Sequence, residues 1–137
     1  MICSYCNSEN SQNIENCGFC NAPLNKQRPI LKDFLFIEQV ELPFQELILF
    51  HTYDILILLR LVREERTRSY SLMRTLQKAP EGVEVDSSSL DFAESEYRRY
   101  TARMKVLEGI LIDRMGYKPK RVDDKLLAAF KAKIENV

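Results

Sequence analysis

The sequence predicts a mainly α-helical protein in which a small four-cysteine module precedes a long antiparallel helical hairpin and a short C-terminal helix. Three observations predict this fold class. The four cysteines occur as two closely spaced pairs within the first 20 residues. Apolar residues recur at intervals of three and four over two long segments, which is the period of an α-helix. The four Gly and five Pro fall mostly outside those two segments, so little interrupts them.

The composition is that of a globular chain without overall charge. Hydrophobic residues make up 45% and charged residues 29%, and 20 basic residues balance 20 acidic ones. A neutral chain exerts no long-range attraction on nucleic acid or an anionic membrane, so we expect any nucleic-acid binding to be local and weak. The N-terminus lacks the pattern of a signal peptide, and the most apolar stretch, 47–62, is too short and too charged to span a bilayer. We therefore expect a cytoplasmic protein without a membrane anchor.

The strongest motif comprises two C-x-x-C pairs separated by ten residues, formed by Cys3, Cys6, Cys17 and Cys20. Two residues between cysteines allow a tight turn that directs both sulfurs at one ion, and a second pair completes a tetrahedral set. Asn7 and Asn21 follow the pairs directly, and Asn tolerates the left-handed backbone of such turns. The alternatives are disulfides, which a reducing compartment disfavours, and a redox C-x-x-C, whose usual βαβ context is missing. Four thiolates leave no position open for water, so the motif predicts one structural Zn²⁺.

Residues 1–26 resemble the small zinc-ribbon family, whose pattern is C-x-x-C-G, a polar stretch with Asn, and then C-x-x-C-G, a small residue and Pro-Leu. The second half of this segment reads Cys17-Gly18-Phe19-Cys20-Asn21-Ala22-Pro23-Leu24, with Asn in place of the usual Gly. The resemblance covers less than a fifth of the chain and implies two rubredoxin-like knuckles on a minimal β-hairpin. Such ribbons serve many unrelated proteins, so the resemblance implies no particular function.

We expect a zinc ribbon at residues 1–26, a linker or strap at 27–42 without a clear apolar period, and a helical domain at 43–137. The first helix is predicted from Pro43, a residue suited to the first turn, to about residue 78. The second is predicted at 88–115, between a serine N-cap and a glycine C-cap, and the third at 123–135. Because a short connection joins the first two helices, we expect them to pair antiparallel.

The segment 55–62 is apolar at seven of its eight positions, which is more than one neighbouring helix can cover. The third helix and the strap are one explanation, and self-association or a protein partner is the other. Leu56 and Leu59 lie off the main apolar stripe, so we expect them to contact a partner or a second copy of the chain. If they instead lie in the core of a monomer, changing both to lysine should unfold the domain.

Charge is segregated along the predicted hairpin. Residues 60–78 carry six basic and two acidic side chains, 79–97 carry six acidic and no basic ones, and 98–121 carry eight basic and two acidic ones. Antiparallel pairing should gather seven arginines into one basic band: Arg60, Arg63, Arg66, Arg68, Arg98, Arg99 and Arg103. Charge runs are usually solvated faces with internal ion pairs. The alternative is a surface that binds phosphates or an acidic partner.

No catalytic set is readable in the sequence. The single histidine, His51, lies on an apolar stripe, and the scattered glycines form no phosphate-binding loop. We therefore expect a non-enzymatic protein-binding regulator or adaptor, with a homo-oligomer as one form of the interaction. The alternative is a nucleic-acid-binding or transcription-machinery-associated factor that uses the Arg-rich hairpin face. Small ribbon-plus-helix proteins are frequent among phage genes, so a phage origin is a further expectation.

Overall fold

The computed structural model describes residues 1–3, 6–24, 30–32, 34–80, 82, 84 and 86–135. The chain forms two compact units, Met1–Ile30 and Leu31–Val137. The predicted fold class is confirmed, because the described residues are mainly helical and a four-cysteine cluster lies in the N-terminal unit. Among the predicted linker residues, 27–29 and 33 lie outside the described part of the chain.

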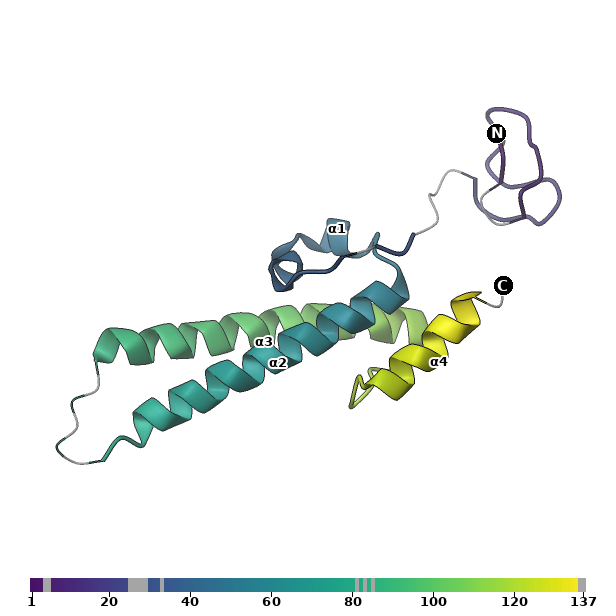
Figure 1. Ribbon diagram of the computed structural model, residues 1–137. Coiled ribbons are helices and arrows are strands. Elements are labelled where there is room, and N and C mark those ends of the chain that lie inside the picture. Colours follow the sequence, from purple (N-terminus) through teal and green to yellow (C-terminus); the bar gives the residue numbers. More distant parts are fainter. Residues whose placement is uncertain are drawn as a thin grey trace. The chain divides into compact units, whose positions relative to one another are not determined.

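The C-terminal unit is a helical hairpin with two additions. Its elements are the 3₁₀ helix η1 (Ile37–Glu41), α1 (Phe44–Leu47), α2 (Thr52–Gln77), α3 (Ser87–Met115) and α4 (Asp124–Glu135). Helices α2 and α3 run antiparallel and side by side, with the connection between them at one end and α4 beside α2 at the other (Figure 1). In the structure the strap comprises residues 31–50 and not the predicted 27–42. It includes η1 and α1, and η1 packs on both long helices.

The ends of the long helices carry local capping signals. The His51 side chain accepts a hydrogen bond from Tyr53 N at 3.0 Å and caps α2. At the start of α3, the Asp86 side chain accepts from Ser88 N at 3.1 Å, so Asp86 and not the expected serine is the N-cap. Helix α3 ends at Gly116, whose φ of 83° lies in the left-handed region that favours glycine.

The expected start of the first helix at Pro43 is wrong. One short turn, α1, follows Pro43, and the chain then breaks before α2 begins at Thr52. The physical reason is burial: Leu47 and Phe50 are 0% and 5% exposed in the hydrophobic core. A continuous helix from Pro43 would carry both side chains past the end of the hairpin, whereas the break folds them back onto it.

The core forms where the N-terminal half of α2 and the C-terminal half of α3 meet the strap and α4. Its buried apolar residues are Val40, Leu47, Phe50, Ile55, Leu56, Leu58, Leu59, Val62, Leu107, Ile110, Leu111, Val122 and Leu127. Three elements therefore surround the apolar segment of α2. Leu56 and Leu59 are both 0% exposed, which corrects the expectation that they contact a partner. The strap and α4 cover the sides of α2 that α3 leaves open.

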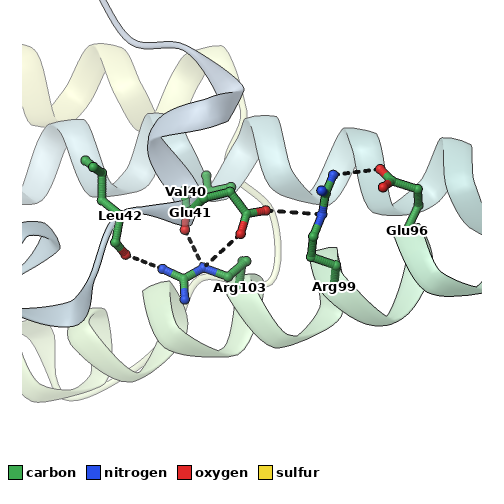
Figure 2. A network of polar contacts seen from close by, with 6 residues as sticks. All are labelled: Val40, Glu41, Leu42, Glu96, Arg99 and Arg103. Carbon is green, nitrogen blue, oxygen red and sulfur yellow. Dashed lines mark hydrogen bonds and ion pairs between the residues drawn. The ribbon is translucent and has the colours of Figure 1, made fainter.

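Polar contacts attach the strap to the hairpin. Arg103 of α3 donates to the carbonyl oxygens of Val40 and Leu42 (Figure 2). In the last turn of α3, Arg114 donates to the carbonyl oxygens of Ile48 and Phe50, each at 2.6 Å. These carbonyls lie at or shortly after the ends of η1 and α1, where carbonyl oxygens lack an intrahelical partner, so the guanidinium groups satisfy them.

The buried Asp54 carboxylate holds the first part of the strap. It accepts a hydrogen bond from Lys32 N at 3.0 Å. Asp54 is almost fully buried, and this burial raises the pKa of its carboxyl group despite the hydrogen bond from Lys32.

Within the described ranges, no helix combines the length and the apolarity that crossing a membrane requires.

Candidate metal centre

The N-terminal unit contains two knuckles with the same backbone hydrogen bonds. In the first knuckle, Cys3 N donates to Ser8 O and Asn7 N donates to Cys3 O, both at 2.9 Å. The second knuckle, 17–22, repeats both bonds fourteen residues later, at 2.8 and 2.9 Å. Isolated antiparallel bridges flank the two knuckles at equivalent positions, 2 with 9 and 16 with 23. The regular spacing of the cysteines is therefore matched by a repeated local structure.

An asparagine in the left-handed region closes each knuckle. Asn7 has a φ of 63° and Asn21 has a φ of 64°. Asn adopts this conformation more readily than other non-glycine residues, because its short polar side chain bonds locally. The sequence prediction of left-handed turn chemistry at both positions is confirmed.

The knuckles bring the four cysteine sulfurs into one cluster. All four Sγ atoms lie within 4.8 Å of one another, and the closest pairs, Cys3 with Cys20 and Cys6 with Cys17, are 3.7 and 3.6 Å apart. A disulfide would require about 2.05 Å. Four sulfurs at about 2.3 Å from a central ion form a tetrahedron with edges of about 3.8 Å. The observed distances therefore fit four thiol ligands around one metal ion.

The surroundings of the sulfurs favour different charges on different cysteines. Backbone N–H groups of Cys20 and Phe19 lower the pKa of Cys17 to about 6. At Cys20 the Ala22 N–H group lowers the pKa, but desolvation and the neighbouring thiols outweigh it and raise the pKa to about 12. Four close thiolates repel one another, so a bound cation is the natural means of holding all four deprotonated.

The Asn10 side chain connects the two knuckles through hydrogen bonds. Its side-chain amide nitrogen lies 3.4 Å from Cys17 Sγ and donates to Ser8 O at 3.1 Å. Its side-chain oxygen accepts from Gly18 N at 2.9 Å. Donors that reach the sulfur from outside the ligand set orient metal ligands and stabilise their charge. Sequence analysis did not single out Asn10, because the polar stretch of the zinc-ribbon pattern also contains Asn13 and Asn16.

Most arginines of the predicted basic band bond acceptors within the C-terminal unit. Each of its α2 members bonds an acceptor: Arg60 to Asp124 (2.7 Å), Arg63 to Glu108 (3.0 Å), Arg66 to Tyr97 (2.8 Å) and Arg68 to Glu65. On α3, Arg99 pairs with Glu96 at 2.7 Å and Glu41 at 3.2 Å, while Arg103 binds the strap (Figure 2). Arg98 is exposed and has no such contact in the described part of the chain.

The structure therefore does not assemble the seven arginines into one free basic surface. Most of them connect α2 and α3 to each other, to the strap or to α4. Arg114, which sequence analysis did not single out, has the same role at the end of α3. Only its position in the last turn of a predicted helix, where basic residues often bond carbonyls, could have drawn attention to it.

Comparison with known proteins gives no relative for this chain. No known family model matches it, and neither a curated protein nor a solved structure matches it significantly. The likeness of residues 1–26 to zinc ribbons therefore rests on the cysteine spacing and on the clustering of the four sulfurs.

Proposed function

We propose that the chain is a non-enzymatic regulator or adaptor that one structural Zn²⁺ folds at its N-terminus and that docks on a protein partner through its strap. The apolar surface of the strap carries this proposal. Large apolar side chains are exposed at sixteen positions in the described part of the chain, and six of these lie within residues 31–49. Exposed apolar surface that gathers in one segment is typical of an interaction site.

The strap exposes both aromatic and aliphatic side chains. Phe34, Leu49 and Phe36 are 76%, 67% and 59% exposed. The strap is also anchored, because Arg103 and Arg114 bond its carbonyl oxygens. An anchored segment loses little conformational freedom on binding, so it can present apolar side chains at low entropic cost.

The choice of zinc follows from the donor set. Tetrahedral four-sulfur sites hold zinc or iron, and closed four-cysteine sites without an open position are typical of structural zinc. Metal analysis of freshly purified, reduced protein should give one zinc per chain. Iron in its place, or a zinc content near zero, would overturn this assignment.

Paired variants test the docking surface. In Phe34→Ser with Leu49→Ser, two exposed strap side chains lose their apolar surface. The control, Leu72→Ser with Phe92→Ser, changes side chains that are 48% and 63% exposed on the hairpin. Sedimentation equilibrium measures self-association, and quantitative pull-down from host lysate, with and without nuclease, measures partner retention.

We expect the strap variant to lose its oligomer or its stoichiometric partner and the control to keep it. A monomeric wild type that retains no protein would contradict the proposal, as would equal retention by both variants. Retention that is salt-dependent and lost on nuclease treatment would favour the nucleic-acid alternative instead.

A further inference from the structure

A basic pocket lies between α2 and the segment that joins α3 to α4. Its volume is about 470 Å³. Five of the eight residues that line it are cationic: Arg60, Arg63, Arg68, Lys120 and Arg121. The other three include one carboxylate, Glu64. Folding thus brings like charges from two distant segments to one concave site, which concentrates positive potential there.

Acceptors within the protein bond the three α2 arginines of the pocket, and Arg68 pairs with Glu65 on its own helix. Arg60 bonds Asp124 Oδ1 at 2.7 Å. Arg63 bonds Glu108 Oε2 at 3.0 Å and the carbonyl oxygen of Lys120 at 3.3 Å. A guanidinium group carries five N–H donors, so one or two acceptors leave further donors for a ligand. Fixed donors of this kind need little reordering when an anion binds.

Lys120 and Arg121 supply the unbalanced charge. Both are exposed, and neither side chain has an ion pair or a hydrogen bond in the described part of the chain. The nearby Glu108 carboxylate is already shared by Arg63, at 3.0 Å, and Lys118, at 3.6 Å. Lys120 and Arg121 are therefore available for an external anion.

We propose that this pocket binds a small anion that carries two or more phosphate groups. Its volume falls within the range of about 300–1,000 Å³ that is typical of small-molecule sites. A guanidinium group can donate two parallel hydrogen bonds to one phosphate group, and an anion with several phosphate groups can bond cations on both segments at once.

The surroundings of the pocket favour a compact anion over a nucleic-acid strand. The exposed carboxylates Asp123, Asp124 and Glu64 flank the cationic side chains. A phosphate backbone that extended beyond the pocket would meet these carboxylates, and the chain as a whole has a net charge of zero. Anion binding at this pocket does not require a protein partner on the strap.

Calorimetric titration of the metal-loaded full chain with inorganic pyrophosphate tests the site, at fixed ionic strength and with ATP in a parallel titration. The test variant is Lys120→Gln with Arg121→Gln, which leaves the internal ion pairs intact. The control is Arg98→Gln with Lys105→Gln, which removes the same charge from exposed positions on α3. Circular dichroism confirms that both variants are folded.

We expect saturable pyrophosphate binding that weakens about tenfold or more in the test variant, since each lost charge-assisted contact is worth about one decade of affinity. The control substitutions should change the affinity for pyrophosphate by less than about twofold. Amide NMR shifts should concentrate at residues 60–68 and 118–122. Equal binding of ATP and pyrophosphate would assign recognition to the phosphates alone, and tighter ATP binding would make the ligand a nucleotide; both support the site. Absence of saturable pyrophosphate binding, equal losses in the two variants, or binding of duplex DNA without pyrophosphate binding would overturn the proposal.

Discussion

The attachment of the strap to α3 depends on Arg103, and Arg103→Met tests this dependence. The guanidinium group donates to the carbonyl oxygens of Val40 and Leu42, and it lies 4.0 Å from a carboxylate oxygen of Glu41 (Figure 2). Methionine keeps an unbranched apolar side chain in place of the arginine stem. The substitution therefore removes the charge and both hydrogen bonds without opening a large cavity.

The magnitude follows from the two carbonyl contacts. A hydrogen bond from a charged donor contributes about 1.5–3 kcal/mol. The Arg103 side chain is 21% exposed, so water replaces part of each bond when the guanidinium is removed. We expect a loss of about 2–4 kcal/mol in the free energy of unfolding of the C-terminal unit. For a unit of this size, that corresponds to a fall of roughly 8–16 °C in the melting temperature.

Urea unfolding followed by circular dichroism at 222 nm measures the effect, because the helices of the C-terminal unit dominate that signal. Arg98→Met is the matched control on the same helix, since the Arg98 side chain is exposed and makes no hydrogen bond or ion pair in the described residues. It should change stability by less than about 0.5 kcal/mol. Hydrogen exchange should also show faster exchange of amides in the strap of Arg103→Met. Equal stability of the two variants would refute the reasoning that Arg103 attaches the strap.

Three further substitutions test the metal centre, the core and the buried carboxylate. Cys6→Ser should abolish metal binding and unfold residues 1–24, because metal binding supplies about 10–16 kcal/mol to such modules. The urea transition of the helices should stay unchanged. Metal analysis measures the metal content, and NMR measures the unfolding of residues 1–24. Leu59→Ala should lower the unfolding free energy by about 2–5 kcal/mol, because Leu59 is 0% exposed. Burial raises the pKa of Asp54, so the folded state binds a proton more readily than the unfolded state. The stability of the wild type should therefore rise relative to Asp54→Asn as pH falls from 7 towards 4, which urea unfolding at both pH values measures.

Each of these predictions has an outcome that contradicts it. A Cys6→Ser chain that still holds one metal ion would show that three sulfurs suffice. A loss below about 1 kcal/mol in Leu59→Ala would place this residue outside a packed core. A stability difference between wild type and Asp54→Asn that grows with rising pH in favour of the wild type would show that the folded state stabilises the ionised carboxylate.

Features that depend on neighbouring residues could be read from the sequence. The C-x-x-C spacing and the following Asn7 and Asn21 specify each knuckle within six residues, so both turns were predictable. The C-terminal end of α3 was predictable in the same way, because Gly116 supplies the left-handed residue that ends a helix. The clustering of the four sulfurs followed from the knuckles, since a pair of such turns can converge on one ion.

Features that depend on distant residues could not be read from it. A proline at position 43 suits a helix start, but the burial of Leu47 and Phe50 depends on what the rest of the chain leaves open, and the helix breaks before Thr52. The apolar segment of α2 required more cover than one helix provides. The sequence could not distinguish a partner from the strap, because both offer the same kind of apolar surface.

The sequence by itself determined the cysteine cluster, the helical hairpin and the sign of the charge along each helix, because each of these arises from residues within a few turns of one another. The tertiary structure alone decided what the charges do. Arg103 bonds a carbonyl oxygen 63 residues earlier in the chain, whereas Arg98, five residues before it on the same helix, makes no bond in the described residues. A guanidinium group bonds any acceptor that the fold places within about 3 Å of it. The packing of distant segments decides which acceptor that is, and local sequence does not determine this packing.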